Sequence, residues 1–227
     1  MVVMAYNNFI KYMVILSIAL FSLGSSCKPK DTCPTGRGYV SIIPVSITPA
    51  KSIYKVGDTL HLNIDFSDRL YDTVSKKEYW FNNFNFDFTP FYVSRLDTLP
   101  GTACLYECSV KPLIGKIYPS GGLCDISYES KYVYQNNRYK LSADIILKRK
   151  GLLCFKTLSV PLKNAGGRYI VNFDKDCLGG EAYGILFRVN NGAINEQFIP
   201  EVIQDGWPKN APLERLKHSG YYLFKVE

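Results

Sequence analysis

Apolar and polar residues alternate along several segments of this 227-residue chain. Between Leu60 and Phe66, for example, leucine, isoleucine and phenylalanine occupy every second position. This period of two indicates β-strands with one buried face and one solvated face, as is typical of antiparallel sheets. The alternating segments are 60–66, 139–147, 169–173, 183–189 and 222–226. Turn-forming residues separate them, and one short helix is expected at 211–217. The sequence therefore predicts an all-β fold, an antiparallel β-sandwich.

The predicted sandwich spans residues 39–227 as a single domain. Hydrophobic residues make up 47% of the chain, which excludes a largely disordered protein. A proline- and glycine-rich stretch at 111–122 leaves open a division into two smaller domains. The segment Tyr54-Lys-Val-Gly-Asp58, which leads into an alternating run, resembles a strand entry of bacterial immunoglobulin-like domains. This resemblance implies an immunoglobulin-like sandwich.

The N-terminus has the layout of a secretory signal peptide. Lys11 precedes an apolar run at 13–23, and small residues follow at 24–26. The run is too short to span a bilayer as a helix. A buried helix of the mature fold is the alternative, but the proline directly after Lys28 would interrupt it. We therefore expect residues 1–26 to be removed.

The segment Leu23-Gly-Ser-Ser-Cys27 resembles the lipobox of bacterial lipoproteins. Gly24 stands where that family usually has leucine, a loosened form similar to lipoboxes of glycan-foraging Gram-negative bacteria. The resemblance implies that Cys27 is lipidated and that residues 27–38 form a lipidated tether to a membrane. Lys28 favours the outer membrane of a Gram-negative cell envelope. Cleavage by an ordinary signal peptidase, which would leave Cys27 unmodified, is the alternative.

The chain has seven cysteines, an odd number. Once Cys27 carries lipid, an even number remains, as expected for disulfides in an exported protein. The disulfide candidates are Cys33, Cys104, Cys108, Cys124, Cys154 and Cys177. Cys104 and Cys108 have a spacing that zinc can accept, but no second pair and no histidine lie near them in the sequence. We therefore expect disulfides, and neither a metal nor a cofactor.

An aromatic segment at 78–88 is the most unusual part of the sequence. If it is extended, Trp80 shares one face with three phenylalanines, and this face is predicted to be buried. The opposite face would present aromatic rings beside amide groups to solvent, an arrangement suited to stacking on sugars and bonding their hydroxyls. The ligand-binding candidates are Tyr79, Phe81, Asn83, Asn85 and, in a turn at 205–208, Trp207. In the alternative, Tyr79 and Phe81 pack under a loop and Trp207 anchors one.

Motifs for catalysis are missing from the sequence. There are two histidines, His61 and His218, and no Gly-x-Ser-x-Gly motif. Acidic residues at 65, 68 and 72 and at 174, 176 and 181 are expected to be solvated loop residues. The net charge is +7, and 148–150 is a basic turn. An exported protein is not expected to bind nucleic acid, whereas anionic glycans would suit this charge.

The sequence thus predicts a lipid-anchored cell-envelope protein that acts as a non-catalytic binding or assembly module. Glycans and envelope proteins are its candidate partners. One alternative is a surface glycoside hydrolase that uses a carboxylate pair. The other is a pilin-like structural subunit, completed by a strand from a partner.

Overall fold

The computed structural model describes residues 39–81, 91–97, 107–120, 127–157, 160–161, 183–202, 213–217 and 220–227. The chain divides into two compact units, and the described residues all belong to the second, Gly36–Glu227. The signal peptide predicted at 1–26, the tether predicted at 27–38 and Cys27 lie outside them.

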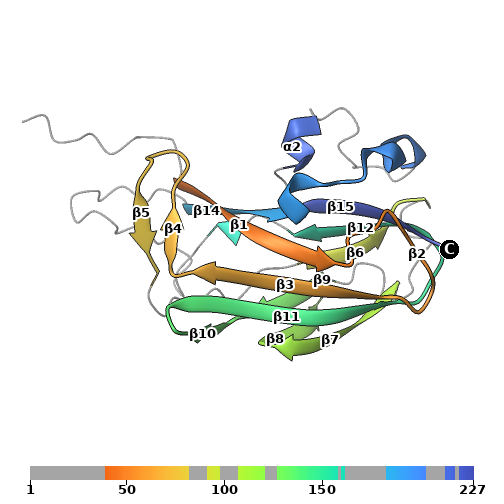
Figure 1. Ribbon diagram of the computed structural model, residues 1–227, viewed down its shortest axis with the longest axis horizontal. Helices are drawn as coiled ribbons and strands as arrows, with labels where there is room; N and C mark the ends of the chain where they lie inside the picture. The colour runs from red at the N-terminus through yellow and green to blue at the C-terminus, as the bar shows by residue number, and fades with distance from the viewer. Residues whose placement is uncertain are drawn as a thin grey trace, which may run out of the picture. The chain divides into compact units, whose positions relative to one another are not determined.

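The larger sheet has seven strands (Figure 1). They are β1 (Tyr39–Thr48), β3 (Thr59–Ser67), β7 (Cys108–Ile114), β10 (Val133–Gln135), β11 (Arg138–Leu147), β13 (Val160–Pro161) and β14 (Tyr183–Val189). Their order is β10-β11-β3-β1-β14-β13, with β7 also paired to β11.

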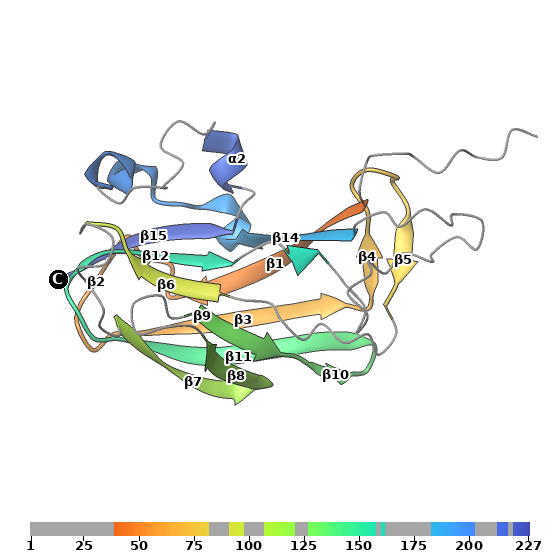
Figure 2. The same cartoon turned by 180° about the vertical axis from the view of Figure 1, so that it is seen from behind.

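The second sheet has six strands and comes forward when the molecule is turned (Figure 2). They are β2 (Ile53–Tyr54), β6 (Phe91–Arg95), β8 (Lys116–Ser120), β9 (Ser127–Lys131), β12 (Gly151–Thr157) and β15 (Tyr221–Val226). Their order is β2-β15-β12-β6-β9-β8. A separate two-stranded ribbon joins β4 (Arg69–Tyr71) to β5 (Glu78–Trp80). The helical elements are η1 (Asn190–Gly192), η2 (Glu196–Glu201) and α2 (Leu213–Lys217).

The all-β fold is confirmed, but the prediction of purely antiparallel sheets is wrong. Strand β1 runs parallel to β14, with Tyr39 opposite Tyr183 and Val45 opposite Val189. Strand β2 likewise runs parallel to β15. Alternation along a strand shows which of its faces is buried, but it carries no information on the direction of the neighbouring strand. Of the alternating segments, 60–66, 139–147, 183–189 and 222–226 are strands, and 169–173 lies outside the described residues.

A continuous apolar core lies between the two sheets. Side chains of the larger sheet, such as Ile43 and Leu62, belong to the same buried cluster as Phe155 and Phe224 of the smaller sheet. Full burial of each such side chain contributes about 1.5–3 kcal/mol. Two sheets that share one core are compatible with a β-sandwich.

On one side, two chain segments pass from one sheet to the other. Strand β7 continues through Gly115 into β8, and β9 continues through Tyr132 into β10. Gly115 has a φ of 82°, and a Cβ there would lie 2.5 Å from the carbonyl oxygen of Lys131. The corner therefore requires glycine, because any side chain would collide with the adjacent backbone.

The smaller sheet is also covered on its outer face. Leu152 and Cys154 of β12 and Leu223 of β15 pack against Phe198 of η2 and Leu216 of α2. The expectation of one solvated face is therefore wrong for these strands. The short helix expected at 211–217 is confirmed as α2, and it belongs to this cover.

Candidate functional site

The β4–β5 ribbon presents its polar and aromatic residues on one face. The register places Arg69 opposite Trp80, Leu70 opposite Tyr79 and Tyr71 opposite Glu78. Because side chains alternate along a strand, the central pair points one way and the outer pairs point the other. Leu70 and Tyr79 are buried in the core. The outward face consists of Arg69, Tyr71, Glu78 and Trp80, and we call these residues the ribbon platform.

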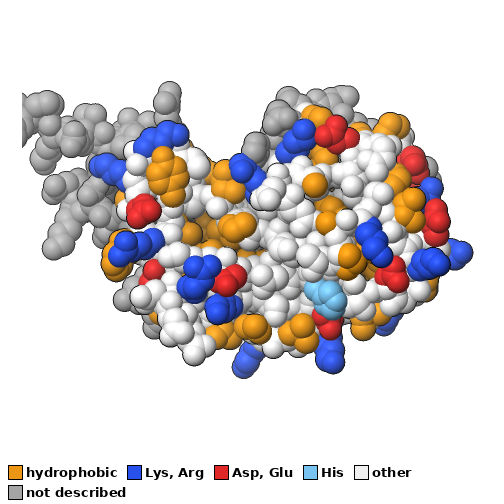
Figure 3. All heavy atoms as spheres, viewed as in Figure 1, with side chains coloured by type: hydrophobic (Ala, Val, Ile, Leu, Met, Phe, Trp, Pro, Cys, Tyr) orange, Lys and Arg blue, Asp and Glu red, His pale blue; other side chains and the backbone are white. Residues whose placement is uncertain are grey.

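Two aromatic rings of the ribbon platform are accessible to solvent. Trp80 is 60% exposed and Tyr71 is 51% exposed. They are diagonal neighbours across the ribbon, a separation that long aromatic side chains can bridge. The guanidinium of Arg69 lies 4.1 Å from the centroid of the indole ring of Trp80. In Figure 3, apolar and basic side chains lie next to one another over this ribbon.

One end of the ribbon is held by Asp72, which is fully buried at the turn after β4. Its carboxylate accepts hydrogen bonds from the backbone N–H groups of Val40 and Ser75. Its own N–H donates to the carbonyl of Lys77, at 2.8 Å. Ser41 of β1 also donates to the carbonyl of Tyr71, at 2.8 Å. These bonds attach the turn of the ribbon to strand β1.

The other end of the ribbon is held by Asp68. Its N–H donates to the carbonyl of Asn137 at 2.9 Å, and its carbonyl accepts from the N–H of Phe81 at 2.7 Å. The hydroxyl of Tyr134 donates to its carboxylate at 2.8 Å. Asp68 is 5% exposed, so these bonds lie away from bulk water. The ribbon platform therefore rests on a backbone that is fixed at both ends.

The buried and exposed faces of residues 79–81 are the opposite of those that the sequence pattern predicts. Tyr79 and Phe81 are 8% and 3% exposed and belong to the core, whereas Trp80 points to solvent. The alternative had both rings packed under a loop; the structure buries both, as members of the core between the sheets. The prediction is wrong because it requires one long strand at 78–88 with the phenylalanines on its buried face. Strand β5 has three residues, and its facing is set by its pairing with Leu70.

The other binding candidates, Asn83, Asn85 and Trp207, lie outside the described residues. Sequence reasoning missed Tyr71, because 69–71 was not recognised as a strand. The sequence does contain a signal for this strand. Leu70 is an apolar residue between Arg69 and Tyr71, and a turn separates this three-residue pattern from the similar pattern of Glu78, Tyr79 and Trp80.

Cys108 and Cys154 are free thiols, contrary to the prediction that both form disulfides. They also belong to different sheets and different clusters: Cys108, on β7 of the larger sheet, lies in the core between the sheets, and Cys154, on β12 of the smaller sheet, lies under the helical cover. Burial raises the pKa of Cys108 to about 11 and that of Cys154 to about 12. A buried thiol packs as a small apolar side chain, and this role accounts for both residues. Cys33, Cys104, Cys124 and Cys177 lie outside the described residues.

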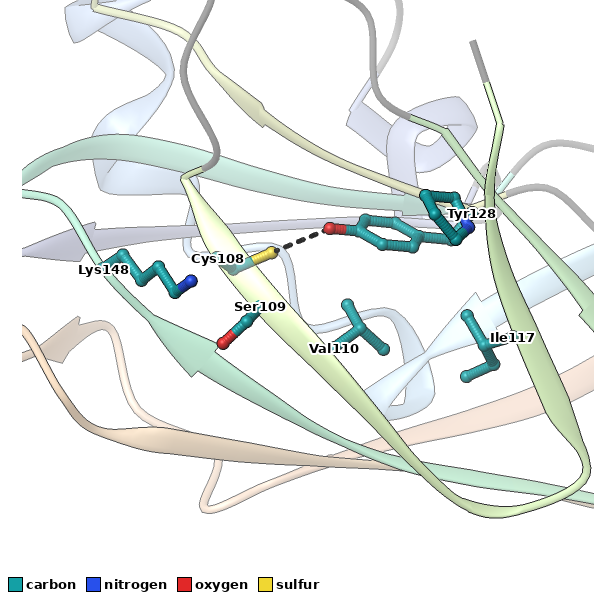
Figure 4. A pocket seen from close by; sticks show the side chains of 7 residues that line it. Cys108, Ser109, Val110, Ile117, Tyr128 and Lys148 are labelled. Carbon is teal, nitrogen blue, oxygen red and sulfur yellow. Dashed lines mark hydrogen bonds between the residues drawn. The ribbon is translucent and has the colours of Figure 1, made fainter. Parts of the chain in front are cut away.

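A pocket of about 290 Å³ lies beside the corner between the sheets (Figure 4). Its lining residues are Cys108, Ser109, Val110, Ile117, Pro119, Tyr128 and Lys148. The thiol of Cys108 lies 3.9 Å from the hydroxyl of Tyr128. The pocket is therefore mainly apolar, with one cationic side chain.

Next to Cys108, Glu107 is a buried carboxyl group without a close partner. It is 7% exposed, and neither oxygen accepts a hydrogen bond within the described part of the chain. Arg95 approaches to 4.0 Å, but its guanidinium donates to Asp97 at 2.7 Å. Burial raises the pKa of Glu107, and the charge of Arg95 opposes this only in part.

The acidic residues expected in solvated loops have different surroundings. Asp68 and Asp72 are buried and bind the ribbon, as described above. Asp65 is paired with Arg138, at 2.7 Å. Residues 174, 176 and 181 lie outside the described residues. His61 contacts Asp144 at 2.7 Å on the outer face of the larger sheet, which confirms that it points away from the core.

Comparison with family models, with curated proteins and with solved structures finds no match for this chain. Among the helices of the described residues, none has the length and apolar character needed to cross a membrane.

Proposed function

We propose that this chain is a lipid-anchored protein of the Gram-negative cell envelope, whose immunoglobulin-like β-sandwich binds glycans without cleaving them. The observation that carries the proposal is the outward Trp80, which shares one ribbon face with Tyr71, Arg69 and Glu78. The predicted signal peptide and the lipobox at Cys27 support a location in the cell envelope, where glycans are abundant polymers.

The ribbon platform has the two kinds of group that recognition of a sugar requires. The indole and phenol rings offer apolar surface on which the C–H face of a sugar ring can stack. Arg69 offers several N–H donors, and Glu78 offers acceptor oxygens, so sugar hydroxyls find both kinds of partner. Such a combination of apolar surface with a few fixed polar groups is typical of binding sites for small ligands.

The ribbon is also suited to binding because its backbone is fixed before a ligand arrives. Asp72 and Asp68 hold its two ends through hydrogen bonds to backbone groups. A site that is ordered in advance loses less conformational entropy on binding. The exposed charges of the ribbon are Arg69, Lys76 and Lys77 against Glu78, an excess of positive charge that favours acidic glycans.

The edges of the sheets favour this function over a pilin-like subunit. Pro112, Pro119 and Pro161 lie in the edge strands β7, β8 and β13, and the edge strands β2 and β10 have two and three residues. Proline removes a backbone donor, and a very short strand offers few hydrogen bonds to a partner. Strand addition by a second chain would therefore be weak at these edges.

A glycan array with the detergent-solubilised full chain tests the proposal. We expect wild type to bind a subset of arrayed glycans, with preference for acidic ones. A Trp80→Ala/Tyr71→Ala variant should bind about fivefold to about 150-fold more weakly, because each of the two aromatic contacts contributes about 0.5–1.5 kcal/mol. Tyr118→Ala is the matched control, since Tyr118 is 50% exposed on β8, outside the ribbon platform.

Three outcomes contradict binding at this surface: no glycan is bound by wild type, the double variant keeps wild-type affinity, or Tyr118→Ala loses as much. Mass spectrometry of the mature N-terminal peptide tests the anchor separately. An unmodified Cys27 would show that the anchoring part of the proposal is wrong.

A further inference from the structure

The pocket beside the corner has apolar walls that come from three strands. Val110 of β7, Ile117 and Pro119 of β8 and the ring of Tyr128 of β9 line it. Cys108 and Tyr128 are buried, and both belong to the core between the sheets. The pocket is thus an opening toward the core, and its walls suit hydrocarbon rather than a sugar.

One end of the pocket is cationic. Figure 4 shows the side chain of Lys148, which follows β11, extending toward Cys108 and Ser109, with Ile117 at the other end. Burial raises the pKa of the Cys108 thiol, and the nearby positive charge of Lys148 lowers it by a smaller amount. Lys148 is exposed to solvent, whereas Cys108 is not. The basic turn at 148–150 therefore contributes a positive charge where the pocket meets water.

We propose that this pocket binds a small anionic amphiphile, a medium-chain fatty carboxylate, with its hydrocarbon between β7, β8 and β9 and its carboxylate at Lys148. At about 30 Å³ for each small group, 290 Å³ holds about ten non-hydrogen atoms, a size that octanoate matches. This site is separate from the ribbon platform and does not depend on the proposed function.

The charges around the pocket agree with an anionic head group. Lys148 is its cationic lining residue, and Ser109 adds a hydroxyl that can donate to a carboxylate. The neighbouring acid, Glu107, has its carboxylate 4.0 Å from Arg95.

Calorimetric titration of the full chain with octanoate tests the site. We expect saturable binding by wild type, and binding about fivefold weaker for Lys148→Gln, the effect of one partly exposed charge pair. Octanol, which lacks the charge, should bind wild type more weakly than octanoate does. Lys150→Gln is the matched control, because Lys150 belongs to the same turn but does not line the pocket. Val110→Phe fills the apolar part and should abolish binding.

The proposal is overturned if wild type shows no saturable binding of octanoate. It is also overturned if Lys148→Gln binds as wild type does, or if Lys150→Gln weakens binding equally, which would indicate unspecific charge attraction. A folded Val110→Phe variant with wild-type affinity would place the ligand elsewhere. If Val110→Phe fails to fold, the comparison of the two lysine variants decides, because both lysines are exposed and their replacement leaves the core intact.

Discussion

Arg69 and Trp80 face each other across the β4–β5 ribbon, and the guanidinium lies 4.1 Å from the indole centroid. A cation in this position is attracted by the negative face of the ring, and a flat guanidinium can stack on it. The contact orients the indole ring, so Arg69 both prepares the aromatic surface and leaves donors for a ligand.

The Arg69–Trp80 pair should contribute to stability as well. A double-mutant cycle with Arg69→Ala, Trp80→Ala and the combined variant should give a coupling free energy of about 0.5–1 kcal/mol, the range for an exposed cation–π contact. Urea denaturation of the four proteins measures it. Lys55→Ala combined with Trp80→Ala is the control pair and should be additive, because Lys55 lies in the turn before β3, whereas the ribbon follows the opposite end of that strand. Additive effects for Arg69 and Trp80 would contradict the contact.

The two free thiols should be protected by folding and not by a disulfide. At about pH 8, burial and raised pKa values should keep Cys108 and Cys154 unmodified by iodoacetamide in the folded protein. In denaturant without reductant, both should be alkylated, and peptide mass spectrometry identifies the sites. If either residue reacts only after a reductant is added, it forms a disulfide in solution, which would contradict this prediction.

The part of the fold that the sequence predicted best consists of long strands with one buried face. In β3 and β11 every second residue is buried, from Leu60 to Phe66 and from Tyr139 to Leu147. Their outer faces meet water, so composition and burial agree at each position. The turn at Asn136 and Asn137, whose φ values are positive, was recognisable for the same reason: asparagine tolerates this backbone.

The remaining features depend on contacts between distant segments. Leu223 lies on the face of β15 opposite Phe224, yet both are buried, because η2 and α2 cover that outer face. The sequence predicts the wrong face for Trp80, because a strand of three residues shows too little alternation to indicate which of its faces is buried. The pairing of Tyr79 with Leu70, nine residues earlier in the chain, makes the choice. The short apolar–polar patterns of β4 and β5 indicate two strands, but only their pairing determines which residues form the ribbon platform.

The buried carboxyl of Glu107 should make stability depend on pH. Its raised pKa means that the folded state binds the proton more tightly than the unfolded chain. Its contribution is therefore most favourable at low pH, and stability is lost as pH rises from the ordinary carboxyl pKa through the raised one. Glu107→Gln should increase the free energy of unfolding at pH 7 by about 1–3 kcal/mol, since it removes a buried charge without hydrogen-bond partners.

Denaturant titrations between about pH 4 and 8 measure this effect, and the gain from Glu107→Gln should shrink toward the acidic end. Glu201→Gln is the control, because Glu201 pairs with Lys225 on the surface, at 3.6 Å, where such pairs contribute little. A Glu107→Gln variant that is less stable than wild type at pH 7 would show that the pairing with Arg95 outweighs the cost of burial.

The corner between the sheets should be sensitive to one methyl group. Gly115→Ala places a Cβ 2.5 Å from the carbonyl oxygen of Lys131, at a φ of 82° that alanine disfavours. We expect a loss of about 2–4 kcal/mol in the free energy of unfolding, from backbone strain and overpacking together. Gly57→Ala is the matched control: Gly57 has a φ of 92° but no atom within 4 Å of the added Cβ. It should cost about 1 kcal/mol, for strain without collision. Equal losses in urea denaturation would mean that Gly115 and the backbone of Lys131 are not in close contact at this corner.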